Sequence, residues 1–231
     1  GKTEGEVDLV KALRRSNDTY FYQVAQALDE KIIGEYAKKL GLGSLTGIDL
    51  PGESPGLVPT NEWKKANVGQ IWYPGDTLHM AIGQGFVLVT PLQLATMTSV
   101  IASNGTLFRP QIVTAQADES GKVIKDYPTQ KVAEDLVSPQ DLAVIKEGMR
   151  QACAQGGTGW PMFTFTKAVV ACKTGTAEFG NLNPHAWFTI FAPVDNPNIV
   201  LTVLIEHGGE GSSVAGPVAR QVLDWWFNQK H

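Results

Sequence analysis

The first part of the chain carries apolar residues at the spacing of an α-helix, interrupted once by a polar stretch. The segment 7-VDLVKALRR-15 has this spacing, and 19-TYFYQVAQALDEKIIGEYAKKLG-41 resumes it after Ser16-Asn17-Asp18. The pattern predicts a helix, a short polar connector and a second helix. Glycines end the second helix, and 46-TGIDLPGESPGLVPT-60, which is dense in Gly and Pro, predicts irregular chain on a surface.

Two later helices are predicted from their start signals. Thr90-Pro91-Leu92-Gln93 combines an N-cap threonine, a proline at the first helical position and a glutamine at the third, so a helix is expected from there to about Ser103. Ser138-Pro139-Gln140-Asp141 opens another capped helix over 139–153. Between these helices, 108-FRPQIVTAQAD-118 and 122-KVIKDY-127 predict the two strands of a hairpin, with its turn at 119–121.

The last third of the chain changes from helical spacing to β-branched and aromatic runs. Three such runs, separated by Gly, Asn and Pro clusters, predict strands over 168–175, 186–193 and 198–208. The segment 214-VAGPVARQVLDWWFNQK-230 is again helical in pattern. Three consecutive strands followed by a helix that can cover them predict an α+β fold, an antiparallel sheet packed by helices.

Composition narrows the classes of function. The 231 residues are 43% hydrophobic, which is enough to bury a sizeable core and makes disorder a poor description. A net charge of -4 offers no basic stripe for phosphates, so we expect no nucleic-acid partner. No run approaches 18 apolar residues, and the segment 1–8 has no signal-peptide pattern.

The cysteines and histidines do not predict a metal site. Cys153 and Cys172 are too few for a disulfide framework, and we expect two free buried thiols, with a disulfide between them as the alternative. The four histidines show no metal-ligand spacing. The sequence therefore predicts neither a metal nor another cofactor.

Two short polar motifs are the candidates for chemistry. Lys173-Thr174-Gly175-Thr176 is predicted to lie where a buried strand meets a turn, and its glycine allows a ligand or another backbone to approach closely. Ser16-Asn17-Asp18 lies between two helices, where short polar side chains can point into a cleft. The alternatives are structural: the first motif can be a solvated strand end, and Ser16 or Asp18 can cap the helix that starts near Thr19. Capping and a functional role are not exclusive.

A lysine-threonine-glycine element together with a serine-aspartate-asparagine element and Ser-x-x-Lys is typical of class A β-lactamases and penicillin-binding proteins. Three separated blocks of this chain, over 8–53, 79–113 and 173–180 followed by 184–193, resemble the transpeptidase domain of class B penicillin-binding proteins of the elongation type (penicillin-binding protein 2). The resemblance covers nearly the whole chain. It implies a partial fold of the penicillin-binding protein and serine β-lactamase type.

The resemblance also implies roles for individual residues. In that family a serine of a Ser-x-x-Lys element attacks the penultimate D-alanine carbonyl of a peptidoglycan stem peptide, and an amine from another stem resolves the acyl-enzyme. By this likeness Ser16 shuttles a proton, and Lys173 holds the positive charge that assists the transfer. Thr174, Gly175 and Thr176 form the wall that binds the substrate carboxylate, and the backbone N–H of Thr176 is one oxyanion donor.

Two departures from the family pattern affect this expectation. Asp18 stands where asparagine is commoner; an ionised carboxylate can accept from a lysine but cannot donate to a substrate carbonyl. We interpret Asp18 as a mark of the elongation type. No serine of the chain has a lysine three positions later, so the nucleophile is absent from these 231 residues. We expect residues 1–231 to be the C-terminal two thirds of one transpeptidase domain, helical over about 7–160, with the sheet and final helix over about 166–230.

The complete protein is expected to be a D,D-transpeptidase that cross-links stem peptides and binds β-lactams, whereas the isolated chain is expected to be inactive. Two alternatives stay open: a serine β-lactamase or β-lactam sensor of the same fold, and a non-catalytic scaffold for cell-wall synthesis. Expected partners are the D-Ala-D-Ala stem peptide, β-lactams, a complementing N-terminal segment and a membrane-embedded glycan polymerase. The resemblance implies an anchored location on the extracytoplasmic face of the bacterial inner membrane.

Overall fold

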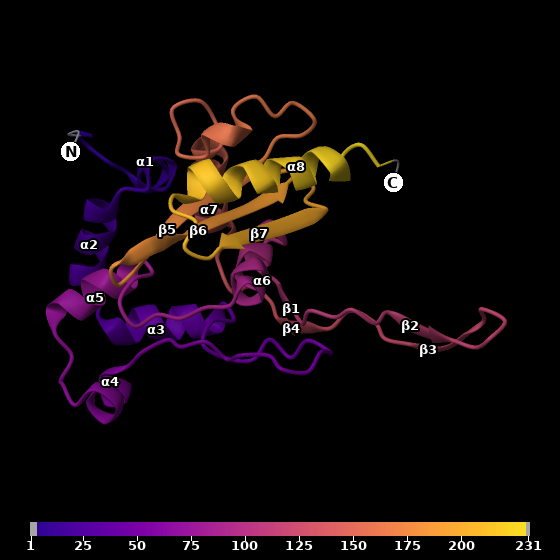
Figure 1. Ribbon diagram of the computed structural model, residues 1–231, viewed down its shortest axis with the longest axis horizontal. Coiled ribbons are helices and arrows are strands. Elements are labelled where there is room, and N and C mark those ends of the chain that lie inside the picture. The colour runs from indigo at the N-terminus through magenta and orange to yellow at the C-terminus, as the bar shows by residue number, and fades with distance from the viewer. Residues whose placement is uncertain (1–3, 230–231) are drawn as a thin grey trace.

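A three-stranded antiparallel sheet in the last third of the chain is the centre of the fold (Figure 1). Its strands lie in the order β5-β6-β7, with the bounds β5 Ala171–Phe179, β6 Leu182–Ala192 and β7 Ile199–Ile205. Helix α8 (Gly216–Trp226) packs on one face, and α6 (Pro91–Ala102) and α7 (Pro139–Ala152) pack on the other. The expected α+β fold, an antiparallel sheet packed by helices, is confirmed. The computed structural model describes residues 4–229.

The two faces of β6 bury different sets of side chains, as the two-residue period of a strand requires. Phe188 and Ile190 are fully buried and belong to the cluster that includes Leu223 of α8. Phe191 points to the opposite face, where it clusters with Met149 of α7. Burying a large apolar side chain contributes about 1.5–3 kcal/mol, so these two clusters hold the helical layers on the sheet that carries the Lys173 motif.

The predicted helix over 19–41 is wrong, because the structure contains two helices there. Helix α1 (Leu9–Arg15) is followed by α2 (Asp18–Ala27) and α3 (Glu30–Lys39). The chain is extended at Leu28, and the side chain of Asp29 accepts a hydrogen bond from the N–H of Ile32, which caps α3. A local cap therefore breaks a segment whose apolar spacing runs on without interruption.

Helices α6 and α7 begin at the predicted caps, and both predictions are confirmed. Thr90 and Gln93 form a reciprocal capping box, and Ser138 accepts from the N–H of Asp141. The irregular segment 46–60 is also as expected, and two short helices that were not predicted follow it. They are α4 (Asn61–Val68) and α5 (Pro74–Ala81).

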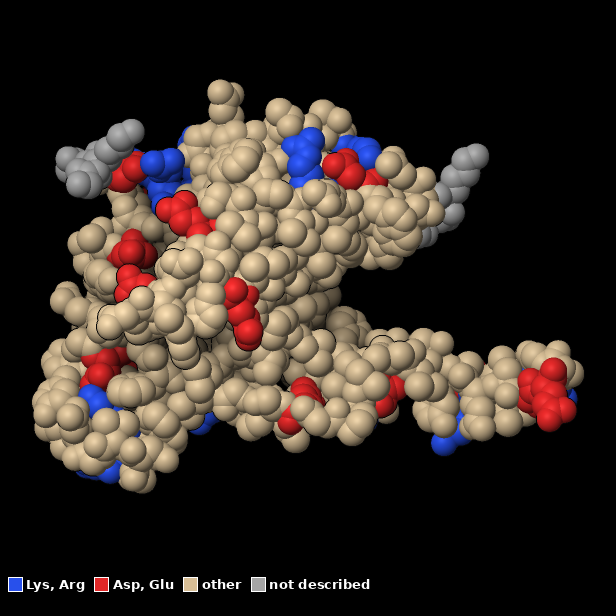
Figure 2. Space-filling view, in the orientation of Figure 1, with Lys and Arg blue, Asp and Glu red and all other residues tan. Residues whose placement is uncertain are grey.

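Two small hairpins form an arm that projects from the body (Figures 1 and 2). Strand β2 (Ala115–Ala117) pairs with β3 (Val123–Asp126), as predicted, and the turn contains Gly121 at a φ of 84°. The run 108–118 is not one strand, however. Its start belongs to β1 (Leu107–Phe108), which pairs with β4 (Lys131–Ala133). Lysine, arginine and acidic side chains are interspersed on the face that Figure 2 shows.

The C-terminal helix is shorter than predicted and has an irregular start. A π-helical turn, η2 (Gly211–Ala215), precedes α8, and a short 3-10 helix, η1 (Trp160–Met162), lies after α7. The prediction placed the end of the final helix at Lys230, which, like His231, lies outside the described residues.

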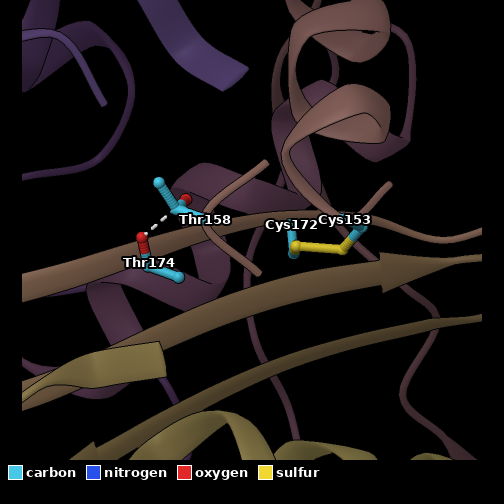
Figure 3. Close-up of a disulfide and its surroundings, with 4 residues drawn as sticks. All are labelled: Cys153, Thr158, Cys172 and Thr174. Carbon is cyan, nitrogen blue, oxygen red and sulfur yellow. Dashed lines mark hydrogen bonds between the residues drawn. A yellow bond between two sulfur atoms is a disulfide. The ribbon is translucent and has the colours of Figure 1, made fainter. Parts of the chain in front are cut away.

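Cys153 and Cys172 form a disulfide, so the expectation of two free thiols is wrong (Figure 3). Cys153 follows the last turn of α7, and Cys172 is the second residue of β5. Because α7 packs against β5, the two cysteines meet although 19 positions separate them in the sequence. The disulfide, which is the alternative to two free thiols, is therefore present, and it joins the end of α7 to the residue before Lys173.

We expect alkylation under denaturing conditions without reductant to label neither cysteine, because both sulfur atoms are in the disulfide. After treatment with a reductant, the same reagent is expected to label both. Mass spectrometry of the intact chain measures the two states. Labelling of both cysteines in the unreduced sample would mean that the thiols are free and that this bond is absent.

Candidate active site

The two candidate motifs meet directly, although 157 positions separate them in the sequence. The ammonium group of Lys173, on β5, donates a hydrogen bond of 2.8 Å to the hydroxyl oxygen of Ser16. A second bond of 2.8 Å goes to the carbonyl oxygen of Thr174. A lysine ammonium only donates, so Ser16 accepts from Lys173 and its own hydroxyl hydrogen is free for another group.

Ser16 is held in an unusual backbone conformation at the end of α1. Its φ of 52° and ψ of 56° are left-handed, which is uncommon for a residue other than glycine and is a feature of strained functional positions. The next residue, Asn17, is the N-cap of α2, and its side chain accepts from the N–H of Tyr20. Ser16 is therefore the C-cap of α1 and Asp18 is the first residue of α2, so the alternative that either one caps the second helix is wrong.

The electrostatics of Lys173 follow from its surroundings. Burial lowers the pKa of Lys173 from its ordinary value of 10.5 to about 8, and the carboxylate of Asp18 opposes this shift. Asp18 itself is exposed at the start of α2. Ser16, Asp18 and Lys173 thus form one group in which an ammonium with a lowered pKa contacts a hydroxyl.

The motif that follows Lys173 lies inside a strand and not at a turn, which corrects the prediction. Strand β5 continues to Phe179, and the hairpin turn comes at Gly180, whose φ is 56°. Gly175 lies opposite Trp187 on β6. A Cβ added at Gly175 would approach the Cβ of Trp187 to 3.1 Å, so glycine fits this close packing.

The two threonines of the motif have different partners. Thr174 donates a hydrogen bond of 2.9 Å to the hydroxyl of Thr158 (Figure 3). Thr176 is exposed, and its hydroxyl accepts a 3.3 Å bond from the N–H of Gly211, at the start of η2. Threonine hydroxyls and a lysine ammonium on one strand form a set of donors suited to an anionic group.

Sequence reasoning missed two residues that contact this strand. The side-chain amide of Gln84 donates a hydrogen bond of 3.2 Å to the carbonyl oxygen of Thr176. Thr158 was not singled out at all. The signal that could have identified it is its place in 156-GGTG-159, a lone hydroxyl between glycines shortly before the Lys173 motif.

Residues 4–229 contain no group of three or more His, Cys, Asp or Glu side chains arranged to hold a metal ion. Helices that are long and apolar enough to cross a membrane are likewise absent from this range.

Comparison with known families assigns the chain to a family. Residues 1–224 match the family described as the penicillin binding protein transpeptidase domain. The chain belongs to this family. The resemblance to the elongation type is also confirmed, because the chain is similar to proteins named MrdA and PBP2.

Among these relatives, the peptidoglycan D,D-transpeptidase MrdA of Haemophilus influenzae is 37% identical over 98% of this chain. Among solved structures, PBP2 of Pseudomonas aeruginosa in complex with WCK 5153 is 36% identical, with a TM-score of 0.85 over 99% of this chain. PBP2 of Helicobacter pylori, solved in complex with MreC, is 34% identical, with a TM-score of 0.77 over 96% of this chain.

The chain spans only part of each relative: 37% of the MrdA protein, 49% of the Pseudomonas chain and 41% of the Helicobacter chain.

Proposed function

We propose that this chain forms part of a peptidoglycan D,D-transpeptidase, which cross-links stem peptides through a serine acyl-enzyme and binds β-lactams. The observation that carries the proposal is the 2.8 Å hydrogen bond from Lys173 to Ser16, which brings together the two motifs of the family that this chain contains. No Ser-x-x-Lys occurs in the 231 residues. We therefore propose that the nucleophile lies on a segment outside them, and that residues 1–231 and this segment form one transpeptidase domain.

In the proposed reaction, the oxygen of the nucleophilic serine bonds to the penultimate D-alanine carbonyl carbon, and the amide bond to the terminal D-alanine breaks. Ser16 accepts a hydrogen bond from Lys173, so its own hydrogen is available for the leaving amine. The proton that leaves the nucleophilic serine replaces the hydrogen that Ser16 has given to the leaving amine. An amine of a second stem then attacks the ester, which forms the new amide and restores the serine.

The strand β5 supplies the binding wall in this proposal. Thr174 and Thr176 present hydroxyls to the terminal carboxylate of the stem peptide, and Gly175 between them permits the close packing of the strand against Trp187. The backbone N–H of Thr176 is one of two donors to the oxyanion, and loss of one such donor typically lowers the rate by about 10²–10³-fold. Gln84 supports this position, because it holds the carbonyl group of the same residue.

The proposed location is the extracytoplasmic face of the bacterial inner membrane, with an anchor and a membrane-embedded glycan polymerase as partners outside this chain. The disulfide between Cys153 and Cys172 supports this location, because disulfides persist in oxidising compartments such as the periplasm and are rare in the cytosol. The PBP2 of Helicobacter pylori, solved in complex with MreC, supports the presence of a protein partner.

Labelling of the full-length protein with a fluorescent penicillin tests the proposed function. Stable labelling that survives denaturing electrophoresis is expected, because the acyl-enzyme is a covalent ester that resolves slowly. Labelling that is rapidly lost would indicate a serine β-lactamase. No labelling at all would overturn the proposal and favour a scaffold. The 231-residue chain alone, which lacks Ser-x-x-Lys, is the matched control and is expected to stay unlabelled.

The pH dependence of acylation is expected to show an alkaline limb near pH 8. Burial lowers the pKa of Lys173 to about 8, so the ammonium is present below this pH and is lost as the pH rises through it. The rate of penicillin acylation should fall over the same range, because the positive charge beside Ser16 disappears. Measuring the acylation rate constant between pH 6 and pH 11, about two units or more on either side of the limb, defines it.

The variant Asp18→Asn provides the control for this limb. The carboxylate of Asp18 raises the pKa of Lys173, so removing its charge should move the limb to lower pH. A limb that stays where it is in this variant would show that Lys173 does not control the reaction. A rate that does not fall until the ordinary lysine value of 10.5 is reached would show that burial does not lower the pKa of Lys173.

A further inference from the structure

The loop between α7 and η1 lies against β5 beside the Lys173 motif, and it carries one hydroxyl group into contact with that strand. Figure 3 shows Thr158 of this loop facing Thr174, and the hydroxyl oxygens are 2.9 Å apart. Both residues are half-buried. The loop therefore adds a polar group to the strand that the family motif alone does not contain.

Glycines and the disulfide hold the loop at this short distance. A Cβ added at Gly159 would lie 2.6 Å from the sulfur of Cys172, and one at Gly157 would lie 2.2 Å from the carbonyl oxygen of Ala152. Real Cβ atoms do not approach other atoms so closely, so only glycine permits this path. The disulfide between Cys153 and Cys172 fixes the start of the loop to β5, two positions before Thr174.

The other side of the loop is bound to the end of α1. Arg14 donates a hydrogen bond of 3.2 Å to the carbonyl oxygen of Gln155, and Arg15 donates one of 2.8 Å to that of Gly156. These arginines directly precede Ser16 in the sequence. The loop thus bridges the helix that ends at Ser16 and the strand that carries Lys173, which fixes where Thr158 stands relative to both.

Binding of an anion requires the hydrogen bond between the two hydroxyl groups to reverse its direction. In the structure Thr174 donates its hydrogen to Thr158. A carboxylate can only accept, so Thr174 must release this bond and turn its hydrogen to the carboxylate. The hydroxyl of Thr158 can then rotate and donate to the oxygen of Thr174. Chains of hydrogen bonds of this kind polarise one another, which strengthens the outer donor.

We propose that Thr158 is a positioning residue of the carboxylate-binding site and acts through the hydroxyl of Thr174. This inference rests on the proposed function, since it assigns a role in binding the carboxylate of a stem peptide or β-lactam. Thr158 supports binding of the carboxylate and takes no part in proton transfer. Its loss should therefore weaken the affinity of the first complex and leave the rate constant of acylation unchanged.

The test compares Thr158→Val and Thr158→Ser with the wild type in the full-length protein. Valine keeps the shape of threonine and removes the hydroxyl, whereas serine keeps the hydroxyl. Acylation time courses over a range of benzylpenicillin concentrations separate the dissociation constant from the rate constant. The valine variant is expected to raise the dissociation constant about tenfold, the usual effect of one hydrogen bond. The serine variant should restore it.

Benzylpenicillin methyl ester distinguishes a role at the carboxylate from a general structural effect. The ester lacks the anion, so Thr158→Val should change its acylation little. An equal loss for the acid and the ester, or a serine variant as weak as the valine variant, would overturn the inference, as would a valine variant that binds benzylpenicillin like the wild type. Failure of the wild type itself to be acylated would instead overturn the proposed function.

Discussion

Replacement of Lys173 with methionine is expected to lower the rate constant of penicillin acylation by about 10²–10⁴-fold, the range typical of a lost proton-transfer group. Methionine has nearly the length of lysine but carries no charge and no donor. The variant therefore loses the 2.8 Å hydrogen bond to Ser16 and the positive charge beside it. Time courses of acylation in the full-length protein, with the fold checked by thermal unfolding, measure the effect.

Two comparisons test whether the effect comes from the contact between Lys173 and Ser16. Lys122→Met removes a lysine from the exposed tip of the arm and should leave acylation unchanged. The double variant Ser16→Ala/Lys173→Met should be no slower than the slower of the two single variants, because residues that act as one unit are not additive. Losses that multiply in the double variant would show that the two side chains act independently.

The parts of this fold that local signals determine could be predicted from the sequence. Helices α6 and α7 begin at Thr90 and Ser138 caps, and the caps are read from neighbouring residues alone. Helix α4 escaped prediction because it has no apolar stripe: the one buried residue along it is Lys64. The sequence of such a helix shows no apolar periodicity from which the helix could be predicted.

The candidate site also has parts that the sequence predicted and parts that it did not. The residue types of the two motifs, and their likeness to a known family, predicted that Ser16 and Lys173 belong together, and the structure brings them into contact. The sequence predicted the disulfide only as an alternative to free thiols, and it did not predict the contact between Thr158 and Thr174. Both depend on how the end of α7 packs against β5, which is a tertiary arrangement that no local pattern encodes.

The buried lysine of α4 leads to the largest expected effect on stability. Lys64 is only 2% exposed, and its ammonium group pairs with the carboxylate of Asp76 on α5. The ammonium also lies over the ring of Tyr73, 4.6 Å from the centroid, and 5.6 Å from that of Phe86. Rings alone do not replace a carboxylate as the partner of a buried cation.

The pKa of Asp76 likewise depends on its pairing with Lys64. Burial by itself raises this pKa, but the hydrogen bonds from Lys64 and from the N–H of Tyr73 outweigh it, so the pKa lies below the ordinary value of 3.8. A carboxylate with a lowered pKa stabilises the fold fully above the ordinary value, and this stabilisation is lost as the pH falls through the lower one. The contribution of Asp76 is therefore complete at neutral pH.

Asp76→Ala is expected to reduce the free energy of unfolding by about 3–5 kcal/mol, the cost of leaving a buried charge without its partner. The double variant Lys64→Met/Asp76→Ala should recover much of this loss, because an apolar side chain of similar length no longer needs a carboxylate. Urea unfolding at neutral pH measures both. The matched control is Glu134→Ala, which breaks the exposed pair with Lys131 and should cause no measurable change. If the double variant were less stable than Asp76→Ala, the loss would come from packing of the lysine stem and not from its unpaired charge.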